Sequence, residues 1–257
     1  GAAGEGNIAQ GFERLKQIFD MIPPKDWERA TISHIHGQVK SIKLGEEGYE
    51  VEIKNTKIND TESLVTPFNS IFRVKEGDIV KPGDKITDGS IDINELLQVA
   101  GISAARDYML KEIQKVYRIQ GIEISDKYVE IILRQMTNKV KVLNRGDSNF
   151  FIGQVIDINT FTQVNTELIA NGQTPITATN LIFGLEAVPS KVDSFLSAAS
   201  FQDTKKTLIE ASVKSQIDTL SGLKENVMLG NLIPAGTGKG DKEQMMEDGQ
   251  KMYKKEY

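Results

Sequence analysis

The sequence has 257 residues, of which 39% are hydrophobic and 26% are charged, and its formal net charge is -5. This composition is ordinary for a globular protein with a real core, and the absence of cysteine excludes disulfides and thiolate metal sites within the chain. The acidic balance argues against a free-standing nucleic-acid binder, which is usually basic, and no apolar run reaches the roughly eighteen residues of a membrane helix.

The start of the chain, GAAGEGN, contains neither a basic region nor an apolar core, so we expect no signal peptide. It also lacks an initiator methionine, which favours a processed or excised piece of a longer chain. Apolar residues at helical spacing then predict a helix over residues 6–22. Pro23 and Pro24 are expected to end it, because proline cannot continue the hydrogen-bond ladder.

The next part of the chain, residues 30–92, has the pattern of short antiparallel strands. Three segments alternate apolar and polar residues: Thr31–Ile35, Gln38–Ile42 and Tyr49–Ile53. Further on, Gly77, Gly83 and Gly89 recur at six-residue spacing, and a proline precedes Gly83. Pro-Gly favours a type II turn in which glycine takes a positive φ. Short strands between regular turns predict a small barrel or sandwich.

From Asn94 the apolar period becomes helical, which predicts one long helix, or two joined near Gly101, with Gly121 as C-cap. Ser125 or Asp126 is expected to cap a second helix. The predicted buried face of that helix consists of Val129, Ile132, Leu133 and Met136. The pattern therefore predicts a helical region directly after the strands.

The last predicted elements are a strand and several short helices. A strand is expected at Lys139–Leu143. Short helices are expected at Asn165–Ala170, Asp203–Ser212 and Leu223–Leu229. The predicted fold class is α+β, with a small antiparallel barrel-sandwich module followed by a mainly helical region. The predicted divisions are 1–29 (helix), 30–93 (β-rich module), 94–193 (helical and mixed region), 194–240 (helical region) and 241–257 (charged tail).

No motif in the sequence predicts a catalytic centre. The loop Gly236–Gly240 resembles a phosphate loop, but Ile233 replaces the first glycine and Gly240 replaces the final hydroxyl residue, which favours a flexible turn. His34 and His36 would share one face of a strand, yet no third ligand stands at a recognisable spacing, which favours two surface imidazoles. The acidic residues form no tight cluster of the kind a two-metal site needs.

Four long runs resemble the beta-prime subunit of bacterial RNA polymerase. They are GNIAQGFERLKQIFD (Gly6–Asp20), VYRIQGIEISDKYVEIILRQM (Val116–Met136), SFLSAASFQDTKKTLIEAS (Ser194–Ser212) and GLKENVMLGNLIPAGTG (Gly222–Gly238). The runs occur in the family's order, and with weaker similarity between them they cover residues 6–240. The resemblance is to the C-terminal segment of that subunit, after its trigger loop.

The resemblance implies a segment of a nucleotidyltransferase, DNA-directed RNA polymerase, without the catalytic aspartates and without the zinc-binding cysteines. No cofactor is expected in this chain; Mg²⁺ and Zn²⁺ are expected in the parent enzyme. The expected partners are DNA, the beta, alpha and omega subunits and the rest of beta-prime, with no membrane, in the cytoplasm and associated with the nucleoid. The β-rich module would correspond to the jaw near downstream DNA, and residues 194–240 to the switch region at the base of the clamp.

The resemblance also implies individual site residues. Lys206 matches a family arginine that contacts the nucleic-acid backbone, and Lys205 precedes it. Lysine keeps the charge but loses the bidentate fork. Lys224, Met228 and Gly230 match the hinge pocket where some inhibitors bind the family. The sequence departs from the family at Gln216, Ile217 and Ser221, where the family has three basic residues, so the implied DNA contact loses three charges.

An alternative from another class is a stand-alone scaffold domain that binds only protein and has no nucleic-acid role. The two hypotheses differ in the sequence that precedes Gly1 in the parent reading frame. The polymerase hypothesis predicts a trigger loop and an aspartate triad there.

Overall fold

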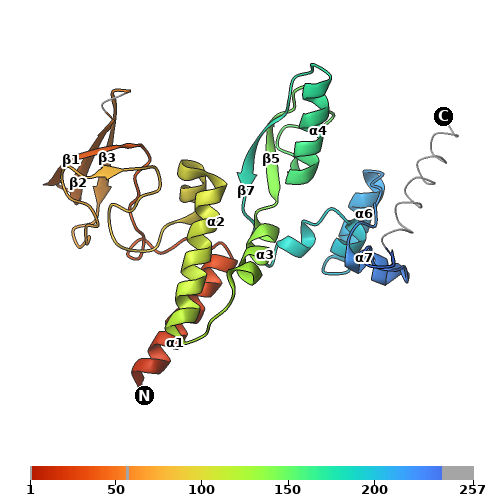
Figure 1. Ribbon diagram of the computed structural model, residues 1–257, viewed down its shortest axis with the longest axis horizontal. Helices are drawn as coiled ribbons and strands as arrows, with labels where there is room; N and C mark the ends of the chain where they lie inside the picture. The colour runs from red at the N-terminus through yellow and green to blue at the C-terminus, as the bar shows by residue number, and fades with distance from the viewer. Residues whose placement is uncertain (1, 56–57, 239–257) are drawn as a thin grey trace. The chain divides into compact units, whose positions relative to one another are not determined.

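The computed structural model describes the backbone of residues 2–55 and 58–238, and the side chains from Gln10 onward. The chain divides into two compact units, Gly1–Gly184 and Leu185–Tyr257. Helices and antiparallel sheets alternate along the first unit, and the second unit is helical in its described part (Figure 1). The predicted α+β class is therefore confirmed. Within the described residues, no helix is both long and apolar enough to cross a membrane.

The first helix is α1 (Ala2–Phe19), which starts before residue 6 and ends before residue 22, the two ends of the predicted range. Its last backbone hydrogen bonds pass into a turn, where Met21 takes φ 56 and Ile22 donates to the carbonyl of Gln17 at 2.9 Å. The chain therefore leaves the helical conformation before Pro23. Ile18 is fully buried, and α1 packs along α2 (Ile93–Ile119).

A four-stranded antiparallel sheet follows, in the order β3-β2-β1-β4. Its strands are β1 (Gly37–Leu44), β2 (Tyr49–Asn55), β3 (Asp60–Thr66) and β4 (Ile79–Val80). The sheet curls around a core of Val39, Val51, Ile53, Val80 and Ile86 (Figure 1). The alternation in the sequence placed β1 and β2 correctly because Val39 on β1 and Val51 and Ile53 on β2 all face this core.

The predicted strand Thr31–Ile35 is wrong. Only Ile32 in that segment forms a bridge, to Lys85, and no named strand is present there. The alternation arose because Ala30 and Ile32 pack beside Ile91 and Leu96 of a separate small core. The predicted turns are confirmed in their key feature, because Gly77, Gly83 and Gly89 all have positive φ.

The long helix α2 is kinked as its glycine predicted. Asp92 caps it and accepts hydrogen bonds from the backbone of Asn94 and Glu95. Gly101 interrupts it with φ 86 and ψ 177, a conformation open to glycine. Gly121 follows the helix with φ 73, as expected of a C-cap glycine.

Helix α3 (Asp126–Met136) has Ser125 as N-cap and packs on α2. Val129, Leu133 and Met136 are buried as predicted. Ile132 was predicted to be buried with them and is 37% exposed, so that prediction is wrong. The helix leaves several apolar side chains uncovered, Tyr128 and Ile131 among them.

The first unit ends with a second sheet, in the order β6-β5-β7, whose strands are all antiparallel. It consists of β5 (Lys139–Asn144), β6 (Val155–Asp157) and β7 (Thr177–Leu181), and α4 (Ile158–Ala170) packs against it. The sequence predicted only the second half of α4, Asn165–Ala170, as helix. The first half of α4, INTFTQV, is rich in β-branched and turn-forming residues, which do not favour a helix. Asn165 fixes the helix to the strand by exchanging two hydrogen bonds with the backbone of Ile176, at 2.7 and 3.0 Å.

A cluster of charged groups connects the first sheet to α2. The ring nitrogens of His34 lie 2.7 Å from a carboxylate oxygen of Glu62 on β3 and 2.9 Å from one of Glu95 on α2. Arg29 also contacts Glu95, at 2.7 Å. His34 and His36 are both exposed, as the interpretation of two surface imidazoles expects, but tertiary folding also brings two distant carboxylates to His34, which the sequence did not predict.

The charges of this cluster shift the pKa values of two members. Burial raises the pKa of Glu95, but hydrogen bonds from Arg29 and His34 outweigh burial and leave that pKa below its usual value. The hydrogen bond to Glu95 raises the pKa of Arg29. Both shifts favour the charged forms, so the contact between sheet and helix is an ionic one.

A neighbouring polar cluster joins α1 to α2. Arg14 contacts Glu112 at 3.2 Å and donates to the Tyr108 hydroxyl at 3.0 Å, which in turn accepts from the Ile91 backbone at 2.8 Å. Burial raises the pKa of Tyr108, and burial lowers the pKa of Lys85, whose ammonium group lies over the Tyr108 ring. The phenol therefore stays protonated at neutral pH.

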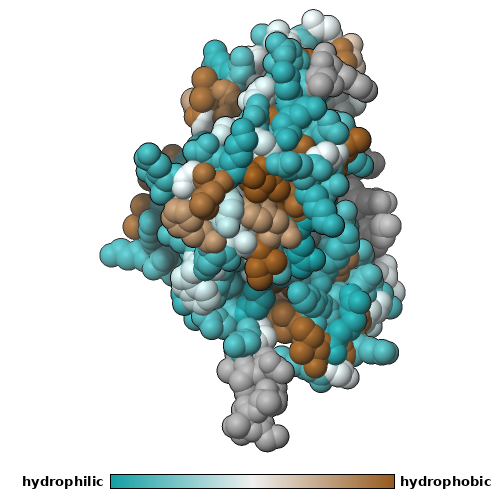
Figure 2. Space-filling model, turned by 90° about the vertical axis from the view of Figure 1, so that its left-hand side faces the viewer, coloured by the Kyte–Doolittle hydropathy of each residue, from teal (hydrophilic) through white to brown (hydrophobic). Residues whose placement is uncertain are grey.

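The first sheet also presents apolar side chains to the outside. Figure 2 shows brown apolar atoms gathered in the middle of one face, between teal polar atoms. The exposed large apolar residues of this part of the chain include Leu44, Val65, Phe68, Ile71 and Ile79. Exposed apolar area of this kind is typical of a surface that another protein covers.

Candidate functional site

The residues that the resemblance selected all lie in the second unit, on two short helices. This unit contains η1 (Val188–Ser190), α5 (Phe195–Ala199), α6 (Thr204–Val213) and α7 (Leu223–Leu229). Helix α5 packs against α6 and against α7, so it joins the two helices that carry the predicted site. The predicted helices Asp203–Ser212 and Leu223–Leu229 match α6 and α7 to within one residue at each end.

Lys205 and Lys206 lie together in the first turn of α6. Asp203 precedes the helix in a left-handed conformation, φ 51, and the chain therefore turns sharply before the two lysines. A shallow hollow of about 630 Å³ is lined by Asp203, Thr204, Lys205, Lys206, Ile209 and Glu210. In the described part of the chain, neither ammonium group has an ion-pair partner. Both charges are therefore available to an external anion.

The position of Lys205 and Lys206 in the first turn of α6 also favours contact with an external anion. The N-terminal end of a helix carries partial positive charge, so a lysine there is not stabilised by its own helix. An anion at this end would be attracted by the backbone dipole and by the ammonium groups together. Two acidic side chains line the same hollow, Asp203 and Glu210, and they reduce the local positive field.

Lys224, Met228 and Gly230 lie on α7 and at its end. Lys224 is exposed, and Met228 is 47% exposed. Gly230 ends the helix with φ 74, and its N–H donates to the carbonyl of Val227 at 3.2 Å. The structure thus places these three predicted residues on one element, whereas Lys205 and Lys206 lie on another.

Sequence reasoning missed the polar residues that hold α7 in place. Glu225 and Asn226 are both buried, at 4% exposure each. The Asn226 amide donates to the carbonyls of Leu220 and Gly222, at 2.7 and 2.6 Å, and the Glu225 carboxylate accepts from the Gly222 backbone. The signal that could have revealed Glu225 is its position three residues after Gly222 and at the third residue of a helix, which is the place of the glutamate in a capping box.

Asp218 is a second residue that the sequence did not reveal. It accepts from the Ser194 hydroxyl at 2.5 Å, from the Leu196 backbone at 3.2 Å and from the Leu220 backbone at 3.0 Å. It therefore ties the start of α5 to the segment that leads into α7. Only the tertiary structure brings these groups together, because Ser194 and Asp218 are distant in sequence.

The described part of the second unit has a small core of its own. Its buried apolar side chains are Ala198, Ala199 and Ala211. Its large apolar residues are mostly exposed, including Val213 at 80%, Ile217 at 72%, Val227 at 64% and Leu232 at 63%. A unit with this distribution resembles one side of a protein interface more than a free-standing domain.

Comparison with known proteins now identifies the family. Residues 7–215 match the model of RNA polymerase Rpb1, domain 5. The chain belongs to the RNA polymerase Rpb1, domain 5 family. The matched region extends from residue 7 to the end of the first unit and on through α6.

Individual members of the family are similar over the entire chain. The DNA-directed RNA polymerase subunit beta' of Malacoplasma penetrans is 59% identical over 261 residues, and that of Mycoplasmoides gallisepticum is 55% identical over 258. The corresponding subunit of Ureaplasma urealyticum is 54% identical over 259 residues. Each match covers 100% of this chain and 20% of the relative, so the chain spans about a fifth of the length of these relatives.

Proposed function

We propose that this chain contributes the downstream-DNA contact and the clamp hinge of a DNA-directed RNA polymerase. The observation that carries the proposal is the similarity of the entire chain to beta' subunits at up to 59% identity. The proposed place is the C-terminal segment of beta', after the trigger loop. The proposed location is the cytoplasm, in association with the nucleoid.

The proposed mechanism is electrostatic and involves no bond chemistry in this chain. Lys205 and Lys206, in the first turn of α6, would contact the phosphates of the DNA backbone, since neither has a counter-ion in the described residues. Lys224, Met228 and Gly230 would belong to the hinge, where α7 ends in a left-handed glycine. Two discrete packings of such an element would open and close the clamp.

The metals that the family implies, Mg²⁺ and Zn²⁺, do not fit this chain. The sequence has no cysteine, and the described residues contain no group of three or more histidine or acidic side chains that could hold a metal ion. No step of the proposed mechanism in this chain uses either metal. We propose that catalysis, and the aspartates that perform it, belong to other parts of the enzyme.

The proposed partners are DNA, the other parts of beta', and the beta, alpha and omega subunits. The exposed apolar residues of the second unit support contacts with protein, because water would otherwise cover them. A stand-alone scaffold that binds only protein would share this feature. The two functions differ in whether the lysines of α6 contact phosphate.

The test is the replacement Lys206→Ala in the complete polymerase. A phosphate contact releases counter-ions from DNA, so its loss should lower the salt dependence of DNA binding by about one unit of slope on a log–log plot. The measurement is the open-complex dissociation constant over a series of salt concentrations. Lys214→Ala removes the same charge at the other end of α6 and serves as the control, with an expected slope equal to that of the unmodified enzyme. Identical slopes for Lys206→Ala and the unmodified enzyme would support the scaffold.

A further inference from the structure

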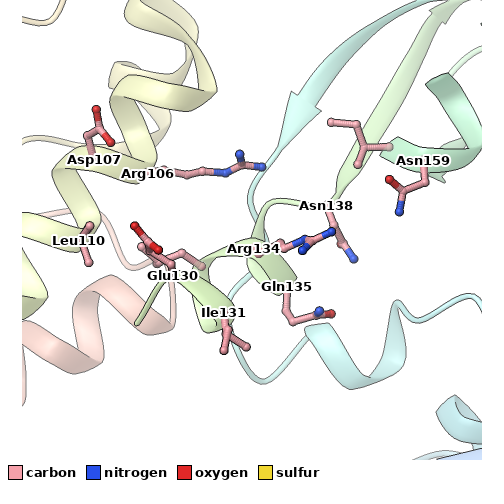
Figure 3. A pocket seen from close by; sticks show the side chains of 11 residues that line it. Arg106, Asp107, Leu110, Glu130, Ile131, Arg134, Gln135, Asn138 and Asn159 are labelled. Atoms are coloured by element: carbon pink, nitrogen blue, oxygen red, sulfur yellow. The ribbon is translucent and has the colours of Figure 1, made fainter. Parts of the chain in front are cut away.

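A second candidate binding site lies in the first unit, whereas the lysines of α6 belong to the second. A pocket of about 670 Å³ opens between α2, α3 and the first turn of α4. Its size is within the range of specific ligand sites, about 300–1,000 Å³. Figure 3 shows Arg106 and Arg134 extending toward the part of the pocket that Asn138 and Asn159 line. The proposed polymerase role does not use these residues.

Arg106 is held in a fixed orientation by α3. Its Nε donates to the Thr137 hydroxyl at 2.7 Å, and one terminal nitrogen lies 3.4 Å from the Thr137 carbonyl. Thr137 is fully buried and in turn donates to the Leu133 carbonyl at 2.7 Å. The guanidinium group has five N–H donors, so this arrangement leaves donors free for the pocket.

Arg106 is also a cation without a counter-ion in the described part of the chain. It is half-buried, and a buried charge is costly unless another charge or several hydrogen bonds compensate it. Arg134, from α3, lines the same pocket and likewise has no ion-pair partner among the described residues. Arg134 is exposed, so water solvates its charge and the cost of burial applies to Arg106 alone. Two guanidinium groups without ion-pair partners in one pocket favour a ligand that carries a carboxylate, since arginine binds carboxylates through paired hydrogen bonds.

The pocket is not uniformly basic. Asp107 and Glu130 also line it, and Figure 3 places them toward the other end from Asn138. These two acids would repel a free phosphate or other small anion. Ile131, at 60% exposure, adds an apolar surface at the same pocket. An acidic end, a basic end and an apolar contact together match a polypeptide segment with charges of both signs.

We propose that this pocket binds a polypeptide segment with charges of both signs from another part of the polymerase, with a carboxylate of that segment held by Arg106 and Arg134. A basic side chain of the same segment would face Asp107 and Glu130. The inference rests on the proposed function, because the bound segment belongs to the assembled enzyme. Its mode of recognition is a protein contact, distinct from the phosphate contact of α6.

The first test is photo-crosslinking in the assembled polymerase. A photoreactive phenylalanine analogue replaces Ile131 in the complete subunit, and mass spectrometry identifies the crosslinked peptide. The expected product is one protein peptide that contains aspartate or glutamate near a basic residue. A crosslink to DNA, a peptide without an acidic residue, or no protein crosslink in an assembled enzyme would overturn the proposal.

The second test is charge reversal. Arg134→Glu should weaken the association of the crosslinked segment at least about tenfold, measured as subunit dissociation at rising salt. Replacement of the acidic residue in the identified peptide by lysine should restore association with the Arg134→Glu subunit. Arg145→Glu, on an exposed loop arginine that does not line the pocket, is the matched control. Equal dissociation of the Arg134→Glu enzyme and the unmodified enzyme would contradict the proposal.

The two proposals can fail separately. A normal salt slope for DNA binding in the Arg134→Glu enzyme, with impaired subunit association, would support the pocket and leave the DNA contact to the Lys206→Ala test. A salt slope about one unit lower in Lys206→Ala, with no effect of Arg134→Glu on subunit association, would support the DNA contact alone and overturn the pocket proposal. Inorganic phosphate could instead stabilise the folded protein, with no peptide crosslinked at Ile131. If Arg134→Glu abolished that stabilisation, the ligand of the pocket would be a free anion, and the pocket proposal would also be overturned.

Discussion

Glu95 shows how one residue connects two elements. Its carboxylate binds Arg29 at 2.7 Å and His34 at 2.9 Å, and it lies in the first turn of α2, where negative charge also favours the helix dipole. Its pKa is lowered in the folded state. These contacts therefore contribute stability above the unfolded pKa of about 4.3, and that stability is lost as the pH falls through the lower folded pKa.

Replacement of Glu95 should reveal this contribution. At neutral pH, Glu95→Gln should lower the free energy of unfolding by roughly 1 kcal/mol, because a charge-assisted contact is replaced by a neutral one. The difference from the unmodified chain should shrink as the pH falls below the unfolded pKa of about 4.3 and through the lower folded pKa of Glu95. Urea unfolding at several pH values measures it. The control is Glu46→Gln, an exposed acid in the β1–β2 turn, and a difference for Glu95→Gln that is independent of pH would contradict the prediction.

At the scale of elements, the stability of α4 depends on the side chain of Asn165 as well as on the helix propensity of its residues. The helix carries β-branched residues and asparagines along its length, yet Asn165 exchanges two hydrogen bonds with the backbone of Ile176 just before β7. These bonds orient the helix over the core of the second sheet. Ile176 is itself 3% exposed, so its backbone groups would have little access to water if Asn165 were lost.

Asn165→Ala should therefore destabilise the first unit by about 2 kcal/mol, because two backbone groups lose their partners. Asn159→Ala removes the same amide from the exposed first turn of α4 and should change the free energy of unfolding by less than about 0.5 kcal/mol. Thermal or urea unfolding of the two variants measures the effect. A loss of stability in Asn165→Ala no larger than that of the control would show that α4 is held by apolar packing alone.

At the scale of the whole molecule, the apolar surface is the dominant feature. Large apolar residues remain exposed on the first sheet, and the second unit buries mainly alanines in its described part. Isolated protein with such surface reduces its contact with water by association. The same surface supports the proposal that other polymerase parts cover the chain.

The isolated chain should therefore self-associate. Sedimentation velocity over a range of micromolar concentrations should show species heavier than the 28.5 kDa monomer. Val213→Lys combined with Val227→Lys should shift the distribution toward monomer, since these side chains are 80% and 64% exposed and their removal costs no core packing. Thr160→Lys, at an exposed position in the first unit, is the control, and a monodisperse unmodified monomer at all concentrations would contradict the prediction.

Local patterns in the sequence determined most of the elements and part of the site. Apolar periodicity predicted α2, α3, α6 and α7, and glycine chemistry predicted the kink at Gly101 and the turns of the first sheet. The four family-like runs predicted the polymerase family, which the match over residues 7–215 confirms. The roles of Lys206, Lys205, Lys224, Met228 and Gly230 and the domain boundaries stay predictions.

The tertiary structure alone decided which distant groups meet. His34 gained two carboxylates from β3 and α2. Asp218 gained donors from the start of α5 and from Leu220, and Arg106 gained its fixed position from Thr137. Periodicity reports only which face of an element is apolar, and it carries no information on which polar groups the fold places within 3 Å of one another. The net negative charge of the sequence argued against DNA binding. Whether Lys205 and Lys206 have acidic partners depends on where the acidic side chains lie in the fold, which the sequence does not show.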